Sequence, residues 1–65
     1  MQIFVNGDRH EIETATLAAA LNALGYGARK IATAVNGRFV AAGARPDLEL
    51  RDGDKIEIVA PMQGG

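Results

Sequence analysis

The first 25 residues decide the fold, and they read MQIFVNGDRHEIETATLAAALNALG. Apolar residues alternate over positions 1–5 and stop at Asn6–Gly7, a pair that tolerates the positive φ angles of a two-residue hairpin turn. The chain then returns over residues 9–13, with Ile12 directed inward. The opening of the chain therefore predicts an antiparallel β-hairpin.

A helix is expected next, because the apolar spacing changes. From Leu17, leucines recur at i, i+4 and i+7, which places them on one face of a helix, and the alanines between them favour that conformation. Thr16 can cap the first turn, since its hydroxyl can accept a free backbone N–H. Gly25 is suited to the left-handed conformation in which many helices end. We expect this helix over residues 17–24.

A second hairpin is predicted further along. The segment 31–35 alternates and ends in Asn36–Gly37, and residues 38–41 return as a short strand. The stretch GARPD, residues 43–47, contains glycine, proline and aspartate, which are typical of turns and interrupt regular structure. We therefore expect a turn there rather than a helix or strand.

The last predicted strand covers residues 55–60. It follows the tight turn Asp52-Gly53-Asp54 and alternates, with Ile56 and Ile58 inward, until Pro61 stops it. Before that turn, the leucines at positions 48 and 50 are expected to pack into the core.

The predicted order is β-β-α-β-β-β, an α+β fold. One helix over a mixed sheet of four to five strands is the simplest way to cover one apolar face with so few residues. The first and last strands can lie parallel in the middle of the sheet, with the helix-containing segment as the crossover. We expect residues 1–60 to form one domain and residues 61–65 a flexible C-terminal tail.

Composition excludes several classes of protein. The 65 residues make one small domain with 7 basic and 8 acidic side chains, a net charge of −1 and no cysteine. Interspersed charges lack the basic footprint of a nucleic-acid-binding protein. No stretch is long and apolar enough for a membrane span, and no signal peptide is recognisable. We expect a cytoplasmic protein without nucleic-acid or membrane partners.

No catalytic or metal site can be assembled from the side chains. His10 is the single histidine, has no nucleophile to partner it, and is expected on the solvent face of its strand. Asp52 and Asp54 flank a glycine and are expected to form a turn rather than a metal site. Arg29–Lys30 and Arg38 could help to dock an acidic groove, although scattered surface charges are the commoner explanation.

In the order of its predicted elements and in its final Gly-Gly, the sequence resembles the ThiS-type sulfur carriers of thiamine biosynthesis, within the β-grasp (ubiquitin-like) superfamily. The resemblance covers the whole chain and rests on MQIFVNG, TLAAALNALG, ATAVNGRFV and LRDGDKIEIVAPMQGG in that order. Two features depart from the family pattern. Ala41-Ala42-Gly43 stands where Pro-Arg and a bulky residue are common, and the segment Pro61-Met62-Gln63 is not a family signature.

The resemblance implies chemistry at the C-terminus. The Gly65 carboxylate would be adenylated with ATP by an E1-like adenylating enzyme and converted to a thiocarboxylate. A sulfur donor such as a cysteine desulfurase would supply the sulfur, and a thiazole synthase would receive it. Gly64 and Gly65 have no Cβ, so the tail is thin enough to enter a narrow channel. The carrier itself would bind no cofactor, would not be an enzyme, and would be a monomer when alone.

A docking surface is expected near the tail. Phe4 and Val59 are predicted to face outward beside its root, and with Met62 they could form an exposed apolar patch. Alternatively, Phe4 folds over an edge or a loop. Two further functions also stay open: a molybdopterin-type or other metabolite sulfur carrier, and a β-grasp module that only binds partners non-covalently and needs no free Gly65.

Overall fold

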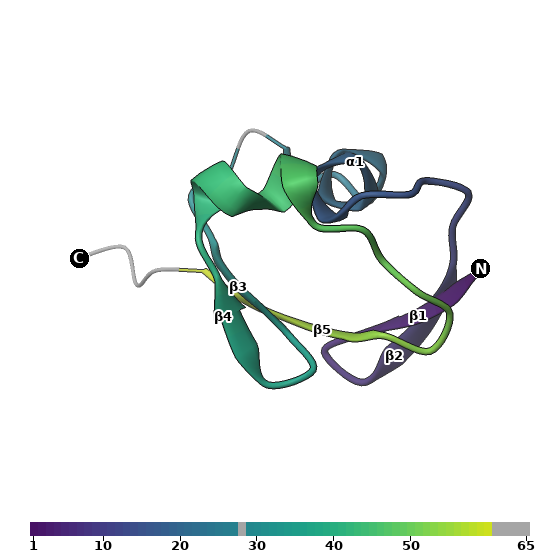
Figure 1. Ribbon diagram of the computed structural model, residues 1–65. Coiled ribbons are helices and arrows are strands. Elements are labelled where there is room, and N and C mark those ends of the chain that lie inside the picture. The colour runs from purple at the N-terminus through teal and green to yellow at the C-terminus, as the bar shows by residue number, and fades with distance from the viewer. Residues whose placement is uncertain (28, 61–65) are drawn as a thin grey trace.

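A mixed sheet and one α-helix make up the computed structural model, which describes residues 1–27 and 29–60. Five strands lie side by side in the order β2-β1-β5-β3-β4. The helix α1 and a short 3-10 helix, η1, lie over the same face of this sheet (Figure 1). The elements are β1 (Gln2–Val5), β2 (Asp8–Glu11), α1 (Leu17–Ala23), β3 (Ala32–Val35), β4 (Arg38–Val40), η1 (Ala42–Asp47) and β5 (Lys55–Val59).

The last strand occupies the middle of the sheet. β5 runs parallel to β1, with Phe4 beside Lys55 and Val5 beside Ile56. On its other side β5 runs antiparallel to β3. The predicted element order and the predicted central pairing of the first and last strands are therefore confirmed.

Both predicted hairpin turns are present, and both hold β5. Asn6 and Asn36 have φ angles of 50° and 52°. The side-chain Oδ1 of Asn6 accepts the Ile58 N–H at 2.8 Å, and its Nδ2 donates to the Ile58 carbonyl at 3.1 Å. The Oδ1 of Asn36 accepts the Lys55 N–H at 3.0 Å, and its Nδ2 donates to Asp54 at 2.9 Å. The central strand is thus fixed by side chains from the turns on both sides.

The helix α1 begins as predicted. Thr16 precedes it, and its Oγ1 accepts the backbone N–H of Ala19 at 3.2 Å. The helix ends at Ala23, one residue earlier than expected, with Leu24 as the C-cap. Gly25 follows with a φ of 92°, the left-handed conformation expected at that point. The helix is too short to be stable alone, so its packing on the sheet must stabilise it.

The core lies between the sheet and the two helices. Ile3, Leu17 and Ile56 have no more than 1% of their surface exposed. Leu50 is also buried and Leu48 packs against the core, which confirms the role expected of both leucines. The buried set consists of Ile3, Val5, Ile12, Leu17, Ala20, Leu21, Val35, Val40, Leu50, Ile56 and Ile58.

One prediction was wrong in the loop after β4. Residues 42–47 form η1 instead of an irregular turn, with Pro46 inside the helix. In a 3-10 helix each backbone N–H bonds to the carbonyl three residues before it, so a short helix of this kind needs few N–H donors. The Ala44 N–H donates to the Ala41 carbonyl at 2.9 Å and the Leu48 N–H to the Arg45 carbonyl at 3.3 Å. The missing N–H of Pro46 therefore falls between two bonds that do form.

The position of His10 also differs from expectation. His10 lies opposite Ile3 in the antiparallel pair of β1 and β2. Residues directly opposite each other share a face, so the imidazole lies on the core side, half-buried at the sheet edge. Side chains along a strand alternate between the two faces of the sheet. Because Ile12 lies in the core, His10, two residues earlier, lies on the same side. Within the described ranges, no helix is long and apolar enough to cross a membrane.

Candidate functional site

The candidate site begins where β5 ends. Val59, its last residue, pairs with Ala32 of β3 and has 63% of its surface exposed. The residues predicted for sulfur attachment and tail access, Gly65 and Gly64, lie outside the described residues, as does the predicted docking residue Met62. The described part of the candidate site therefore consists of the domain surface around the end of β5.

Phe4 lies on the face of the sheet opposite the helices. Its neighbours Ile3 and Val5 are buried, whereas Phe4 is half-buried and stands between Arg9 of β2 and Lys55 of β5. Lys55 is the first residue of β5 and Val59 the last. At about 3.3 Å per residue, roughly 13 Å separate these two positions along the strand. The structure therefore places Val59, but not Phe4, beside the root of the tail.

The sequence reasoning missed an exposed aromatic residue on the same face. Phe39 of β4 has 73% of its surface exposed and lies opposite Ala34 of β3. A usable signal was present, because the two-residue turn Asn36–Gly37 fixes the register of this hairpin. With Val40 inward, the preceding Phe39 must point outward. The uncovered face of the sheet thus carries Phe4, Phe39 and Val59.

A shallow hollow adjoins the end of β5. Its volume is about 480 Å³, and it is lined by residues 29–32, Ala42, Arg45 and Val59. Arg45 is fixed on one side of it: the guanidinium donates from Nε to Thr33 at 3.0 Å and from Nη2 to the Ile31 carbonyl at 2.7 Å. The hollow therefore combines an apolar floor with basic side chains.

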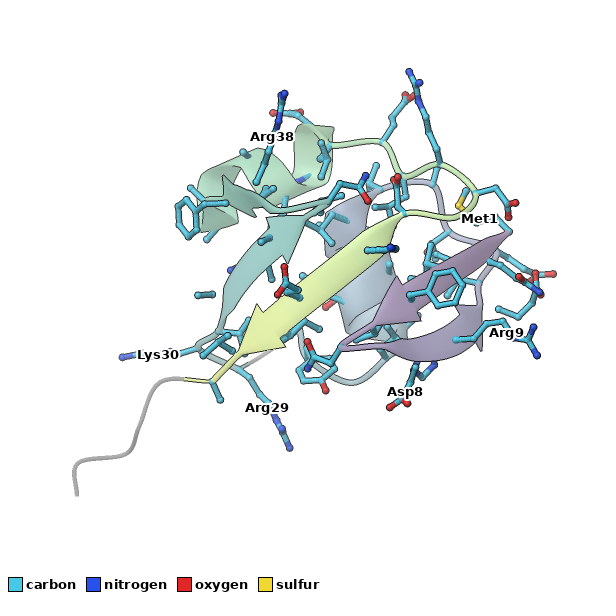
Figure 2. The ribbon with its side chains drawn as sticks, turned by 90° about the horizontal axis from the view of Figure 1, so that it is seen from below. Met1, Asp8, Arg9, Arg29, Lys30 and Arg38 are labelled. Atoms are coloured by element: carbon cyan, nitrogen blue, oxygen red, sulfur yellow. The ribbon has the colours of Figure 1, made fainter. Side chains whose placement is uncertain are left out.

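Two exposed cations stand at this end of the molecule. Figure 2 shows Arg29 and Lys30 extending into solvent beside the arrowhead of β5. Among the described residues, the one salt bridge joins the N-terminal ammonium group to Glu11 and involves neither cation. The Arg29 guanidinium lies 5.7 Å from the centre of the Tyr26 ring. Tyr26 in turn packs against the core.

The acidic residues before β5 have structural roles. The Asp52 Oδ1 accepts the Gln2 N–H at 2.7 Å, and the Asp54 Oδ2 accepts the Arg51 N–H at 2.8 Å. Gly53, between them, has a φ of 89°. Across residues 1–27 and 29–60 there is no group of three or more side chains that could hold a metal ion. The prediction that this segment is a turn is confirmed.

The sequence is similar to known proteins over its whole length. The model of the ThiS family matches residues 3–65. The sulfur carrier protein ThiS of Thermus thermophilus is 36% identical over 63 residues, which cover 97% of this chain and 98% of that protein. A thiazole synthase of Paramagnetospirillum magneticum is 35% identical over 66 residues, but this match spans only 20% of that protein and all of this chain.

Solved structures agree with these matches. A crystal structure of the thiamine biosynthesis protein ThiS from Geobacter metallireducens superposes with a TM-score of 0.82 at 28% identity, covering 100% of both chains. A solution structure of a thiamine biosynthesis protein from the same organism gives a TM-score of 0.77 at 26% identity, covering 100% of this chain and 88% of the other.

Proposed function

This chain belongs to the ThiS family, and we propose that it is a sulfur carrier for thiazole formation in thiamine biosynthesis. One observation carries the proposal: the family match includes Gly64–Gly65. The match to the Thermus thermophilus carrier over 98% of that protein supports it further. In this proposal the chain is a protein co-substrate of other enzymes and not itself a catalyst.

The chemistry takes place at the α-carboxylate of Gly65, which is ionised at neutral pH. In the active site of an adenylating enzyme, a carboxylate oxygen attacks the α-phosphorus of ATP, and pyrophosphate leaves. The terminal sulfur of a persulfide, supplied by a donor such as a cysteine desulfurase, then attacks the acyl carbon and displaces AMP, which gives an acyl disulfide. A thiol reduces this disulfide by bonding to the donor sulfur, and the sulfur bound to the acyl group leaves with the carrier. The product is a C-terminal thiocarboxylate, whose sulfur passes to the substrate of a thiazole synthase.

The position of β5 suits this role. The strand that leads to the tail is the central one, paired on both edges and held by Asn6 and Asn36. The domain can therefore stay folded outside a partner while residues 61–65 enter it. Glycine at the last two positions adds no side chain to the segment that must pass a narrow channel.

A thiazole synthase is the proposed acceptor enzyme. The support comes from the Paramagnetospirillum magneticum protein named thiazole synthase, one fifth of which is similar to this whole chain. A protein named thiazole synthase thus contains a segment that is similar to this chain. This favours thiazole formation over delivery of sulfur to a pterin or another metabolite.

The part of the uncovered sheet face that β1 and β5 form is the proposed docking surface for these enzymes. Val59 at the end of β5 and Phe4 on β1 lie on it, and Met62 of the tail completes the proposed set. If this assignment holds, Phe4→Ala slows adenylation by the activating enzyme. Phe39→Ala, on the same face but two strands beyond β5, is the matched comparison. An unchanged adenylation rate for Phe4→Ala would remove Phe4 from the docking surface.

Intact mass spectrometry tests the central proposal. The chain is produced with its adenylating enzyme, ATP and a sulfur source. We expect a species heavier by the replacement of one oxygen with sulfur. It should be absent when Gly65 is deleted and when one alanine is appended after Gly65. If the full chain never shows this mass shift under those conditions, a non-covalent interaction module becomes the better explanation.

A further inference from the structure

We propose that Arg29 and Lys30 form a basic contact site at the root of the tail, which binds carboxylates around the channel mouth of the adenylating enzyme. This inference rests on the proposed function, because it assumes that the tail enters that enzyme. It adds a site that the apolar docking surface does not include. Both cations lie in the segment between α1 and β3, beside the hollow that Val59 lines.

The length of the tail determines which part of the domain meets the enzyme. From Val59 to Gly65 the chain spans at most about 22 Å when fully extended, at ~3.6 Å per residue. The α-phosphorus of ATP must therefore lie within that reach of the end of β5. Because stable interfaces bury about 800 Å² on each partner, the tail needs support from the domain surface around its root. Arg29 and Lys30 belong to that surface.

The two cations have charge available for a partner. Within the described part of the chain, neither has a carboxylate within salt-bridge distance. Arg45, the third cation at the hollow, differs because its guanidinium already donates to Thr33 and to the Ile31 carbonyl. Its positive charge adds to the local potential, while its donors hold η1 against β3. Among the described cations at this end, Arg29 and Lys30 are thus the two whose charged groups are not held by the domain's own hydrogen bonds.

The surroundings of Arg29 favour a carboxylate partner. Its guanidinium lies near the ring of Tyr26, which is packed on the core, so part of the ordering cost of the side chain is already met. A guanidinium can bind a carboxylate through two parallel hydrogen bonds. The apolar floor formed by Ile31, Ala32 and Val59 offers contact for a neighbouring apolar side chain. The occupant that fits is an acidic segment of a protein surface.

The test compares three double variants in adenylation assays. Arg29→Gln with Lys30→Gln removes both charges at the site. Arg38→Gln with Arg51→Gln removes the same charge elsewhere: Figure 2 shows Arg38 away from the end of β5, and Arg51 precedes the turn into that strand. Arg29→Lys with Lys30→Arg keeps both charges. Pyrophosphate release is measured against carrier concentration at low and at high salt, and thermal unfolding confirms that each variant is folded.

For the Arg29→Gln, Lys30→Gln variant we expect KM for the carrier to rise about fivefold at low salt, with kcat unchanged. Contacts of this kind act mainly on encounter and weaken as salt screens them. The difference should therefore shrink at high salt, and the Arg38→Gln, Arg51→Gln variant should stay near the wild-type KM. The charge-preserving variant should lie between the two, because it keeps both charges but removes the guanidinium beside the Tyr26 ring.

Three outcomes overturn the proposal. Equal KM values for the two glutamine variants would show that the charges have no specific role at the tail root. A normal adenylation KM combined with slower sulfur transfer to the thiazole synthase would assign the site to that enzyme instead. If the wild-type chain is not adenylated at all, the proposed function itself fails, and the partner assigned here fails with it.

Discussion

Replacing Asn6 with glycine should test how the central strand is held. The Asn6 N–H donates to the Ile56 carbonyl at 2.9 Å, after which the main chain turns away. The side-chain amide then continues the pairing, with bonds of 2.8 and 3.1 Å to the N–H and carbonyl of Ile58. Glycine accepts the φ of 50° at this position, so Asn6→Gly removes the side-chain bonds without straining the turn.

The expected loss follows from these two bonds. Each contributes about 0.5–1.5 kcal/mol net, which gives roughly 1–3 kcal/mol for the pair. Glycine also raises the entropy of the unfolded chain and relieves the positive φ, two effects of opposite sign and each on the order of 1 kcal/mol. A net loss of about 2 kcal/mol should lower the melting temperature by roughly 8–16 °C in a domain of this size.

Thermal unfolding followed by circular dichroism measures this loss, and hydrogen exchange locates it. The Ile58 amide should lose protection before the other amides of β5. Asn36→Gly is the matched control, since its side chain bonds to Lys55 and Asp54 are exposed and should contribute less. If Asn6→Gly melts within about 2 °C of wild type and the Ile58 amide remains protected, the side chain does not hold the strand and the reasoning is refuted.

Two further substitutions probe the elements around the core. Thr16→Ala removes the acceptor for the Ala19 N–H and should cost about 1 kcal/mol, whereas Thr16→Ser should be close to neutral; equal urea midpoints for both would contradict the capping role. Thr33→Val removes the hydroxyl that donates to the Val40 carbonyl and accepts from the Arg45 Nε, and it should cost roughly 1–3 kcal/mol, with Thr33→Ser as the control that keeps the hydroxyl; a Thr33→Val variant as stable as wild type would show that these two bonds contribute nothing.

Local signals in the sequence predicted most of the fold. Asn6 and Asn36, each followed by glycine, specify two turns whose geometry is set within four residues. Thr16 and Gly25 mark the two ends of the helix, the first through a hydrogen bond and the second through its φ angle, and both features involve only nearby atoms. The position of Phe39 could also have been derived, because a two-residue turn fixes which residues face each other.

Non-local features were harder to predict. The parallel register of β1 and β5 depends on the whole crossover between them, so the sequence did not reveal that Phe4 lies beside Lys55 rather than near Val59. The 3-10 helix around Pro46 depends on tertiary contacts, among them the Arg45 bonds to β3 and the loop before it. The sequence predicted chemistry at Gly65 and raised Arg29–Lys30 as possible docking residues, whereas their position beside the end of β5 required the fold.

The central position of β5 has a mechanical consequence. A partner that draws residues 61–65 into a channel applies force to β5 along its own axis. That strand is bonded to β1 on one edge and to β3 on the other. A load along the axis stretches the bonds of both ladders together in shear, whereas peeling an edge strand breaks them one at a time. In the proposed function, this arrangement lets the domain stay folded under a pull on residues 61–65 while Gly65 is modified.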